Sequence, residues 1–281
     1  EISNITLENI DITGTTSVDA LPGSGGATVR NATATGTVTG SGDFVGGLVG
    51  GEHTGSIRNS TADVTVEGDR LVGGLAGSQG PGGSIQDVTS TGDVTGSDNF
   101  VGGLVGGTPG PVQNATATGD VTGFGGFVGG LAGQNNGASF ENMTAKGNVS
   151  GSGNQVGGLV GRNRNNGSIT NATADGDVSG SGNLVGGLVG ANFKSSIANA
   201  TATGTVIANA TATGTVSGDD LFWVGGLVGI NNRASIQNST ATGNVSTDNS
   251  NRVGGLAGAS FKSSIANATA AGTVDGENQT G

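Results

Sequence analysis

The sequence predicts an all-β protein built as a parallel β-solenoid (β-helix), and three observations carry this prediction. First, the hexapeptide Val-Gly-Gly-Leu-(Val/Ala)-Gly occurs eight times. Second, successive copies begin 27, 29, 27, 28, 29, 39 and 29 residues apart, a near-constant period typical of one unit stacked many times. Third, apolar and polar residues alternate between the copies with a period of two, which indicates β-strands. The copies begin at Val45, Val72, Val101, Val128, Val156, Val185, Val224 and Val253.

Helices and propeller blades explain this repeat less well. Pairs of glycines and many β-branched residues disfavour a helix, and no period of 3.6 residues is present. A β-propeller blade has a longer repeat with four strands, whereas each repeat here offers three short apolar segments. We therefore expect coils of about 28 residues with three short strands each, stacked about 4.8 Å apart.

Residues 31–39 represent the first strand of a coil. Thr33 and its alternate neighbours face water, while Ala34 and Val38 face the core. Small inward residues of this kind suit a narrow core in which facing strands approach closely. The inward valine recurs as Val66, Val94, Val121, Val149, Val178, Val206, Val216, Val245 and Val274.

A turn rich in glycine and aspartate follows, and an apolar residue such as Phe44 precedes the glycine motif. We expect residues 45–50 to form the second short strand, with glycines where larger residues would crowd a neighbouring coil. A variable loop comes next, and Ile57 opens the third strand.

Two parts of the chain depart from this pattern. Residues 1–30 lack the glycine motif and are expected to form an irregular first coil or an N-terminal cap before the repeat region, residues 31–281. Residues 197–206 and 207–216 are identical, and because ten residues cannot complete a coil, we expect one copy to bulge out or form a partial coil. The sequence stops within a repeat, so we expect a longer parent protein or stacking on another subunit.

The motif in residues 45–50, followed by Ser56-Ile57, Asn59, Ala62 and Val66, resembles the GLUG repeat. The resemblance covers about residues 31–281 and recurs in all eight copies. It implies a repeat region of a large secreted or cell-surface, adhesin-like protein. Some surface peptidases also carry such repeats, but the resemblance does not imply that activity, because it lies outside the repeats.

Composition excludes some classes of partner. The formal net charge is −11 and the pI about 4.2, which argues against nucleic acid, since phosphate binding needs clustered Lys and Arg. The chain has no cysteine and no apolar run long enough to cross a membrane. No signal peptide begins at Glu1, which fits a cytosolic or a processed chain, and the sequons below favour the second. The Asp-rich, Lys-poor composition suggests a salty environment.

We expect no catalytic residues and no resident cofactor. His53 is the one histidine, so neither a Ser-His-Asp triad nor a histidine metal site can assemble, and we expect it to lie in a solvated loop. Paired carboxylates, as in glycan-cleaving β-helices, remain an alternative. Ca²⁺ is the candidate ion, bound at an acidic turn by Asp219, Asp220 and Asp248.

Fourteen Asn-x-(Ser/Thr) sequons predict N-glycosylation. Nine of them form one repeat column, which we expect to be a ladder of asparagines that hydrogen-bond their own turns, because glycans about 5 Å apart would collide. The column sites are Asn31, Asn59, Asn114, Asn142, Asn171, Asn199, Asn209, Asn238 and Asn267. Glycosylation is expected mainly at the other sites, Asn4, Asn148, Asn166, Asn244 and Asn278.

Basic and aromatic residues gather in the loops after four consecutive C-terminal glycine motifs. They predict a ridge that binds an anionic glycan or a neighbouring chain, although corner loops are also where charges are most easily solvated. The residues are Arg162, Arg164, Phe193, Lys194, Arg233, Phe261 and Lys262.

These observations together predict a non-catalytic, extracellular structural or adhesive repeat segment of a cell-surface protein or filament. Its expected partners are other copies or flanking segments, joined end to end, and cell-surface glycans. A glycan-binding or glycan-cleaving β-helix is the alternative. Ice binding by the outward threonine column, which includes Thr33, is a minor alternative because Asp63, Lys146 and Asp175 interrupt the neighbouring column.

Overall fold

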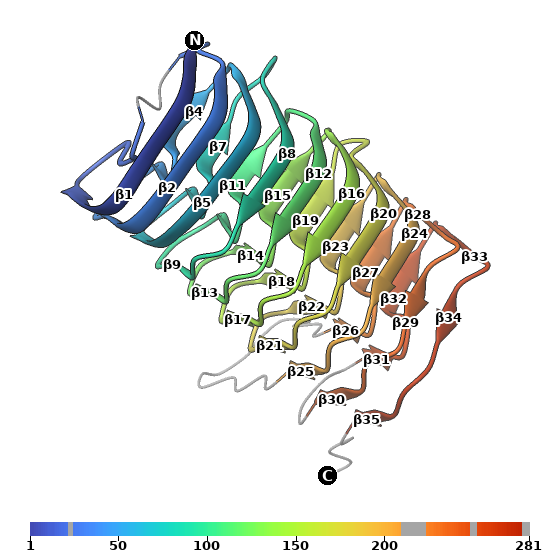
Figure 1. The fold of residues 1–281 in the computed structure, drawn as a ribbon. Helices are drawn as coiled ribbons and strands as arrows, with labels where there is room; N and C mark the ends of the chain where they lie inside the picture. The colour runs from blue at the N-terminus through green and yellow to red at the C-terminus, as the bar shows by residue number, and fades with distance from the viewer. Residues whose placement is uncertain (22–24, 209–222, 248–251, 277–281) are drawn as a thin grey trace.

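A computed structural model describes residues 1–21, 25–208, 223–247 and 252–276. Every element in these ranges is a β-strand, and the strands wind into a parallel β-solenoid of about nine turns. Figure 1 shows the coils stacked side by side as a rod, with the N-terminus at one end and the C-terminus at the other. The predicted fold class is therefore confirmed.

Three parallel sheets run along the rod, and each coil between β2 and β32 contributes to all three. The largest sheet, sheet A, takes one long strand from each of the first three coils and shorter strands from the later ones. Its strands are β1 (Ile2–Gly14), β2 (Val29–Gly40), β5 (Ser56–Gly68), β8 (Ser84–Ser90), β9 (Val94–Gly96), β12 (Val112–Ala117), β13 (Val121–Gly123), β16 (Ser139–Ala145), β17 (Val149–Gly151), β20 (Ser168–Ala174), β21 (Val178–Gly180), β24 (Ser196–Ala202), β25 (Val206–Ala208), β28 (Ser235–Gln237), β29 (Thr240–Ala241), β30 (Val245–Thr247), β33 (Ser264–Ala266), β34 (Thr269–Ala270) and β35 (Val274–Gly276).

Sheets B and C contain eight strands each within the described residues. Sheet B consists of β3 (Val45–Gly46), β6 (Val72–Gly73), β10 (Val101–Gly102), β14 (Phe127–Gly129), β18 (Gln155–Gly157), β22 (Leu184–Gly186), β26 (Trp223–Gly225) and β31 (Arg252–Gly254). Sheet C consists of β4 (Val49–His53), β7 (Ala76–Gln79), β11 (Val105–Thr108), β15 (Ala132–Asn136), β19 (Val160–Arg164), β23 (Val189–Phe193), β27 (Val228–Asn232) and β32 (Ala257–Phe261).

The glycine motif is a corner between two sheets, so the expectation of a single strand over residues 45–50 is wrong. The chain leaves sheet B after Gly46 and enters sheet C at Val49. The bend turns Leu48 into the core, where it is fully buried. A Cβ atom on the second glycine of a motif would collide with the backbone of the next coil, as Gly74 shows against the carbonyl of Gly103. Glycine is therefore required there by the close approach of the coils.

Equivalent residues lie directly over one another along the rod. In sheet A, Val38 pairs with Val66, and Val66 with Val94. Val38 and Val66 are fully buried and Val94 is 1% exposed. The inward columns expected from the period-two pattern thus form the core, in which each residue contacts its copies in the two adjacent coils.

The first coil and the ten-residue duplication, which depart from the repeat in sequence, also join the sheets in their own ways. The first coil pairs with the second through β1 and β2, and continues through isolated bridges of Val18 and Leu21 to β3 and β4. The first copy of the ten-residue duplication, residues 197–206, lies in register with the strands that follow it. The second copy lies outside the described residues from residue 209 onward.

Candidate functional site

The structure gives His53 a different position from the expected solvated loop. Its side chain is fully buried at the end of β4, opposite Gln79 of β7. The Gln79 side-chain nitrogen donates to the carbonyls of His53 and Gly55 at 2.6 and 2.8 Å. The expectation is wrong because the alternation of β4 places Glu52 outward and His53 inward.

His53 begins a column of buried polar residues that the sequence analysis missed. Gln79, Thr108 and Asn135 continue the column, and Asn163, Asn192 and Asn231 extend it. The four asparagines are fully buried. From Gln79 to Asn231, each member lies seven residues after the valine that begins its glycine motif, and this constant spacing was the available signal.

The buried asparagines hold the corner loop and each other. The side chain of Asn135 accepts from the backbone nitrogen of Ala138 at 2.9 Å and donates to its carbonyl at 3.0 Å. Further along, Asn163 donates to Asn192, and Asn192 to Asn231, both at 2.9 Å. These bonds give hydrogen-bond partners to polar groups that the fold removes from water.

A second asparagine column lies exposed on sheet A, and it is the expected ladder. Asn142 donates to Asn114 at 2.9 Å, and Asn171 donates to Asn142 at 3.2 Å. The φ angles of Asn114, Asn142 and Asn171 are 52°, 59° and 55°. This is a left-handed conformation, which asparagine adopts more readily than other non-glycine residues. Both the conformation and the hydrogen bonds explain the repetition of asparagine without any glycan.

The asparagines of the sequons outside the ladder differ from those of the ladder in which side-chain atoms form hydrogen bonds. Asn148 and Asn244 each use the side-chain oxygen to accept a backbone N–H, from Asp177 and Thr273, at 3.0 and 2.9 Å. Both residues are exposed, and their side-chain nitrogens donate to no described residue. Asn4 begins the ladder by accepting from Asn31 at 2.9 Å. Asn209 and Asn278 lie outside the described residues.

Candidate sites for metal or catalysis gain no support from the described ranges. Within them, no group of three or more His, Asp or Glu side chains could hold a metal ion. The calcium candidates Asp219, Asp220 and Asp248 lie outside those ranges. At the acidic turn, Asp43 instead pairs with Arg70 at 2.7 Å, which raises the pKa of Arg70 through their hydrogen bond.

The predicted basic and aromatic ridge forms one continuous corner of the rod. In sheet C, Arg164, Phe193, Asn232 and Phe261 are paired in register, and the next residues, Lys194, Arg233 and Lys262, are exposed. We call Arg162, Arg164, Lys194, Arg233 and Lys262 the cationic corner.

Arg162 is the most enclosed member of the cationic corner. Its guanidinium lies 4.0 Å from the ring centroid of Phe127. With the Gln134 carboxamide oxygen turned toward it, Arg162 donates from Nε and Nη2 at 3.0 and 2.7 Å. Burial, together with repulsion from Arg164, lowers the pKa of Arg162 to about 10. Nearby, Trp223 contacts Phe261 at a centroid distance of 5.4 Å, and the Arg252 guanidinium lies 5.8 and 5.6 Å from the centroids of these two rings.

The outward threonines also align. Thr33, Thr61, Thr89, Thr116 and Thr144 are paired in successive coils, and the column continues toward the C-terminus. The charged residues of the neighbouring column lie within the same sheet, where Asp63 accepts from Thr91 at 2.7 Å. Ice binding therefore stays an untested alternative.

Comparison with known proteins supports the sequence resemblance. The profile of the GLUG motif matches residues 45–67, 68–95, 152–179, 181–207, 224–246 and 249–275, more than half of the chain. Halomucin from Haloquadratum walsbyi is 44% identical over 91 residues, which cover 28% of this chain and 1% of halomucin. No solved structure matches the chain. No helix of the described residues could span a membrane.

Proposed function

The chain belongs to the GLUG motif family, and we propose that it is a rigid, extracellular structural segment of a much longer cell-surface protein. Halomucin supports this proposal, because its name is that of a mucin and the matched segment is about 1% of its length. Repetition supports it too, because stacked coils provide length and stiffness before any chemistry. We further propose that such segments join end to end.

The alignment of inward residues from coil to coil is the observation that carries the proposal. In the interior of the rod, Val245 is 1% exposed and Ile236 is fully buried. Their partners in the last described coil, Val274 and Ile265, are 47% and 39% exposed. Within the described residues, these inward columns are thus fully covered in the interior coils and only partly covered in the last one.

One more coil of the same kind would cover this face. The strands β33, β34 and β35 pair with the preceding coil on one side, and their other backbone groups can receive a further parallel strand. At the opposite end, β1 presents the partly exposed apolar side chains of Ile2, Ile5, Leu7, Ile10 and Ile12. We propose that the two faces stack on each other in successive segments.

We also propose that the segment is a glycoprotein modified at few sites. Asn148 and Asn244 are the favoured acceptors because their side-chain nitrogens are exposed and take part in no described hydrogen bond. The ladder asparagines commit that nitrogen to the neighbouring coil.

Electron microscopy of the purified chain tests end-to-end stacking. A single copy should form a rod of about 45 Å, and raising the protein concentration should add rods with lengths near multiples of that value. Ile265→Lys with Val274→Asp places charges on the open face and should leave single rods. Thr269→Lys with Thr273→Asp, two outward positions of the same coil, is the matched control and should still stack.

Two results would reject the stacking proposal. One is a rod that stays single at every concentration, and the other is stacking that survives the inward charges unchanged. Lateral rafts of rods instead of longer rods would point to a side-by-side assembly.

A further inference from the structure

The cationic corner borders a shallow groove at the C-terminal half of the rod. Its larger part has a volume of about 700 Å³ and runs across three coils. A second hollow of about 250 Å³ extends it past Arg162 and Arg164 and shares Lys194 and Arg233 with the first. No residue lining either hollow is acidic.

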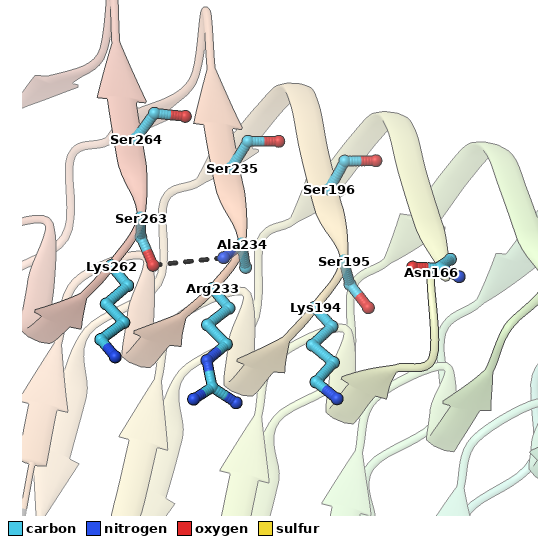
Figure 2. Close-up of a pocket in the computed structure, with 10 residues that line it drawn as sticks. All are labelled: Asn166, Lys194, Ser195, Ser196, Arg233, Ala234, Ser235, Lys262, Ser263 and Ser264. Atoms are coloured by element: carbon cyan, nitrogen blue, oxygen red, sulfur yellow. Dashed lines mark hydrogen bonds between the residues drawn. The ribbon is translucent and has the colours of Figure 1, made fainter.

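Two parallel rows of side chains line the larger hollow, and Figure 2 shows both. One row consists of Lys194, Arg233 and Lys262, whose side chains extend in the same direction. The other row consists of the serines that open β24, β28 and β33, which are paired in register. Each coil therefore offers one cation and one hydroxyl, repeated about every 4.8 Å along the rod.

The backbone fixes the cations in this arrangement. Lys194, Arg233 and Lys262 all have φ angles of about 50°, in the left-handed region. The backbone nitrogen of Lys194 donates to Asn232 at 3.0 Å, and that of Arg233 donates to Phe261 at 2.8 Å. Like charges are thus held one coil apart, where they repel each other until an anion neutralises them.

No carboxylate of the described residues neutralises this corner. Among all the lysines and arginines of the described residues, only Arg70, which lies outside this corner, forms an ion pair with a carboxylate. Asp175 and Asp177 already accept hydrogen bonds from their own chain, from Thr203 at 3.0 Å and from the backbone of Thr205 at 2.7 Å. Five of the ten lysines and arginines therefore lie together with no ion-pair partner among the described carboxylates, in a chain of net charge −11.

We propose that this groove binds a linear acidic polysaccharide that lies parallel to the rod. Carboxylate or sulfate groups of the polymer meet the cation row, and sugar hydroxyls meet the row formed by Ser196, Ser235 and Ser264. Phe193, which lines the smaller hollow, offers an apolar face to a sugar ring. End-to-end stacking is not required for this binding, because the cation row and the serine row both lie within a single segment.

Charge density favours a polysaccharide over nucleic acid. Duplex DNA carries about one charge per 1.7 Å of its axis, whereas the groove supplies one cation per coil of about 4.8 Å. The excess of acids elsewhere on the chain would repel the unmatched phosphates. A polymer with one acid group per one or two sugars has a spacing closer to that of the cations.

Isothermal titration of the full chain tests the proposal. The probes are polygalacturonate as a carboxylated polymer, dextran sulfate as a sulfated one, neutral dextran and a single-stranded oligothymidylate. We expect at least one acidic polysaccharide to bind and both neutral dextran and oligothymidylate to bind more weakly. Affinity should fall as salt is added, because the contacts are largely ionic.

Matched charge variants locate the binding. Lys194→Gln, Arg233→Gln and Lys262→Gln together should weaken binding about tenfold or more. The substitutions keep long side chains at positions that already hold them, so folding is preserved. Arg30→Gln, Arg58→Gln and Lys146→Gln together remove the same charge from sheet A and should change affinity less than about twofold. Ser196→Ala, Ser235→Ala and Ser264→Ala together should weaken binding by a smaller factor.

Each contrary outcome has a definite meaning. Equal losses in the two charge triples would overturn the groove and leave only nonspecific attraction. Tighter binding of oligothymidylate, or no binding of either acidic polysaccharide, would overturn the proposed ligand. Self-association that the groove triple abolishes would assign the corner to a second copy instead.

Discussion

Two columns of asparagine run along the rod, and they use the same side chain for different purposes. The ladder on sheet A, represented by Asn142, is exposed and holds a left-handed backbone. The column in sheet C, represented by Asn163, is fully buried and bonds to the next coil and the corner loop. In the first column asparagine is favoured by its backbone preference, and in the second by its hydrogen bonds.

The comparison separates two energetic roles of a repeated residue. An exposed asparagine can exchange its side-chain hydrogen bond for one with water, so losing it costs little beyond backbone strain. A buried asparagine cannot, because its removal leaves the partner side chain with no hydrogen bond to water or to protein. Substitutions in the two columns should therefore differ in how much they lower the free energy of unfolding, and in whether lost hydrogen bonds or backbone strain cause the loss.

The largest effect is expected in the buried column. Asn163→Leu should lower the free energy of unfolding by about 2–3 kcal/mol, because the side-chain oxygen of Asn192 loses its donor inside the protein. Urea unfolding followed by circular dichroism measures the change. A loss no larger than that of an exposed substitution would contradict the role assigned to the buried column.

A smaller effect is expected on the exposed ladder. Asn142→Ala should lower the free energy of unfolding by about 1 kcal/mol, because alanine tolerates the left-handed backbone less well than asparagine. Asn142→Gly removes the same hydrogen bonds without that strain and should cost less. If glycine were as costly as alanine, the hydrogen bonds and not the backbone would dominate the ladder.

Double-mutant cycles sharpen the contrast further. Asn163→Leu and Asn192→Leu together should lower the free energy of unfolding by less than the sum of the single changes, with a coupling of about 1 kcal/mol. In the double variant both hydrogen-bonding side chains are gone, so neither one is left buried without the other. The equivalent cycle with Asn142→Ala and Asn171→Ala should give at most a few tenths of a kcal/mol. Equal couplings in the two columns would remove the distinction between them.

Much of this architecture was predictable from the sequence, because neighbouring repeats place the same residue type over itself. The alternation around Val38 and Ala34 predicted the buried columns, and the spacing of the asparagines predicted the ladder that includes Asn142. The corner at Leu48 was not predictable in the same way. Alternating glycine and apolar residues resemble a strand, and only the crowding between coils shows that the chain must bend there.

The buried polar column was missed for a different reason. The residues on either side of Asn163 and Asn192 vary from arginine to alanine and phenylalanine, so no period-two pattern marks that strand. In the first glycine-motif coil, a register shift between Val49 and Glu52 moves His53 one place further from its motif. His53 therefore looked like an isolated loop residue. The roles expected for Asn209, Asp219, Asp220, Asp248 and Asn278, which lie outside the described residues, remain predictions.

The smallest structural effect, and a direct chemical contrast, is expected for glycosylation. When the chain is secreted from a glycosylating host, Asn148 and Asn244 should carry glycans at higher occupancy than Asn142 and Asn171. The ladder nitrogens are engaged, and glycans one coil apart would collide. Glycopeptide mass spectrometry measures each occupancy. Equal occupancy along the ladder would show that its hydrogen bonds do not protect the amides.

Hydrogen exchange tests most directly the central claim that a coil is stabilised by the coils on both sides, including those of the next segment. We predict slow exchange for amides in β20 at any concentration and fast exchange in β33–β35 at low concentration. At high concentration the last coil should become protected in the wild-type chain but not in the Ile265→Lys, Val274→Asp variant. Protection of the last coil that is the same at both concentrations, or unchanged by the variant, would contradict the claim.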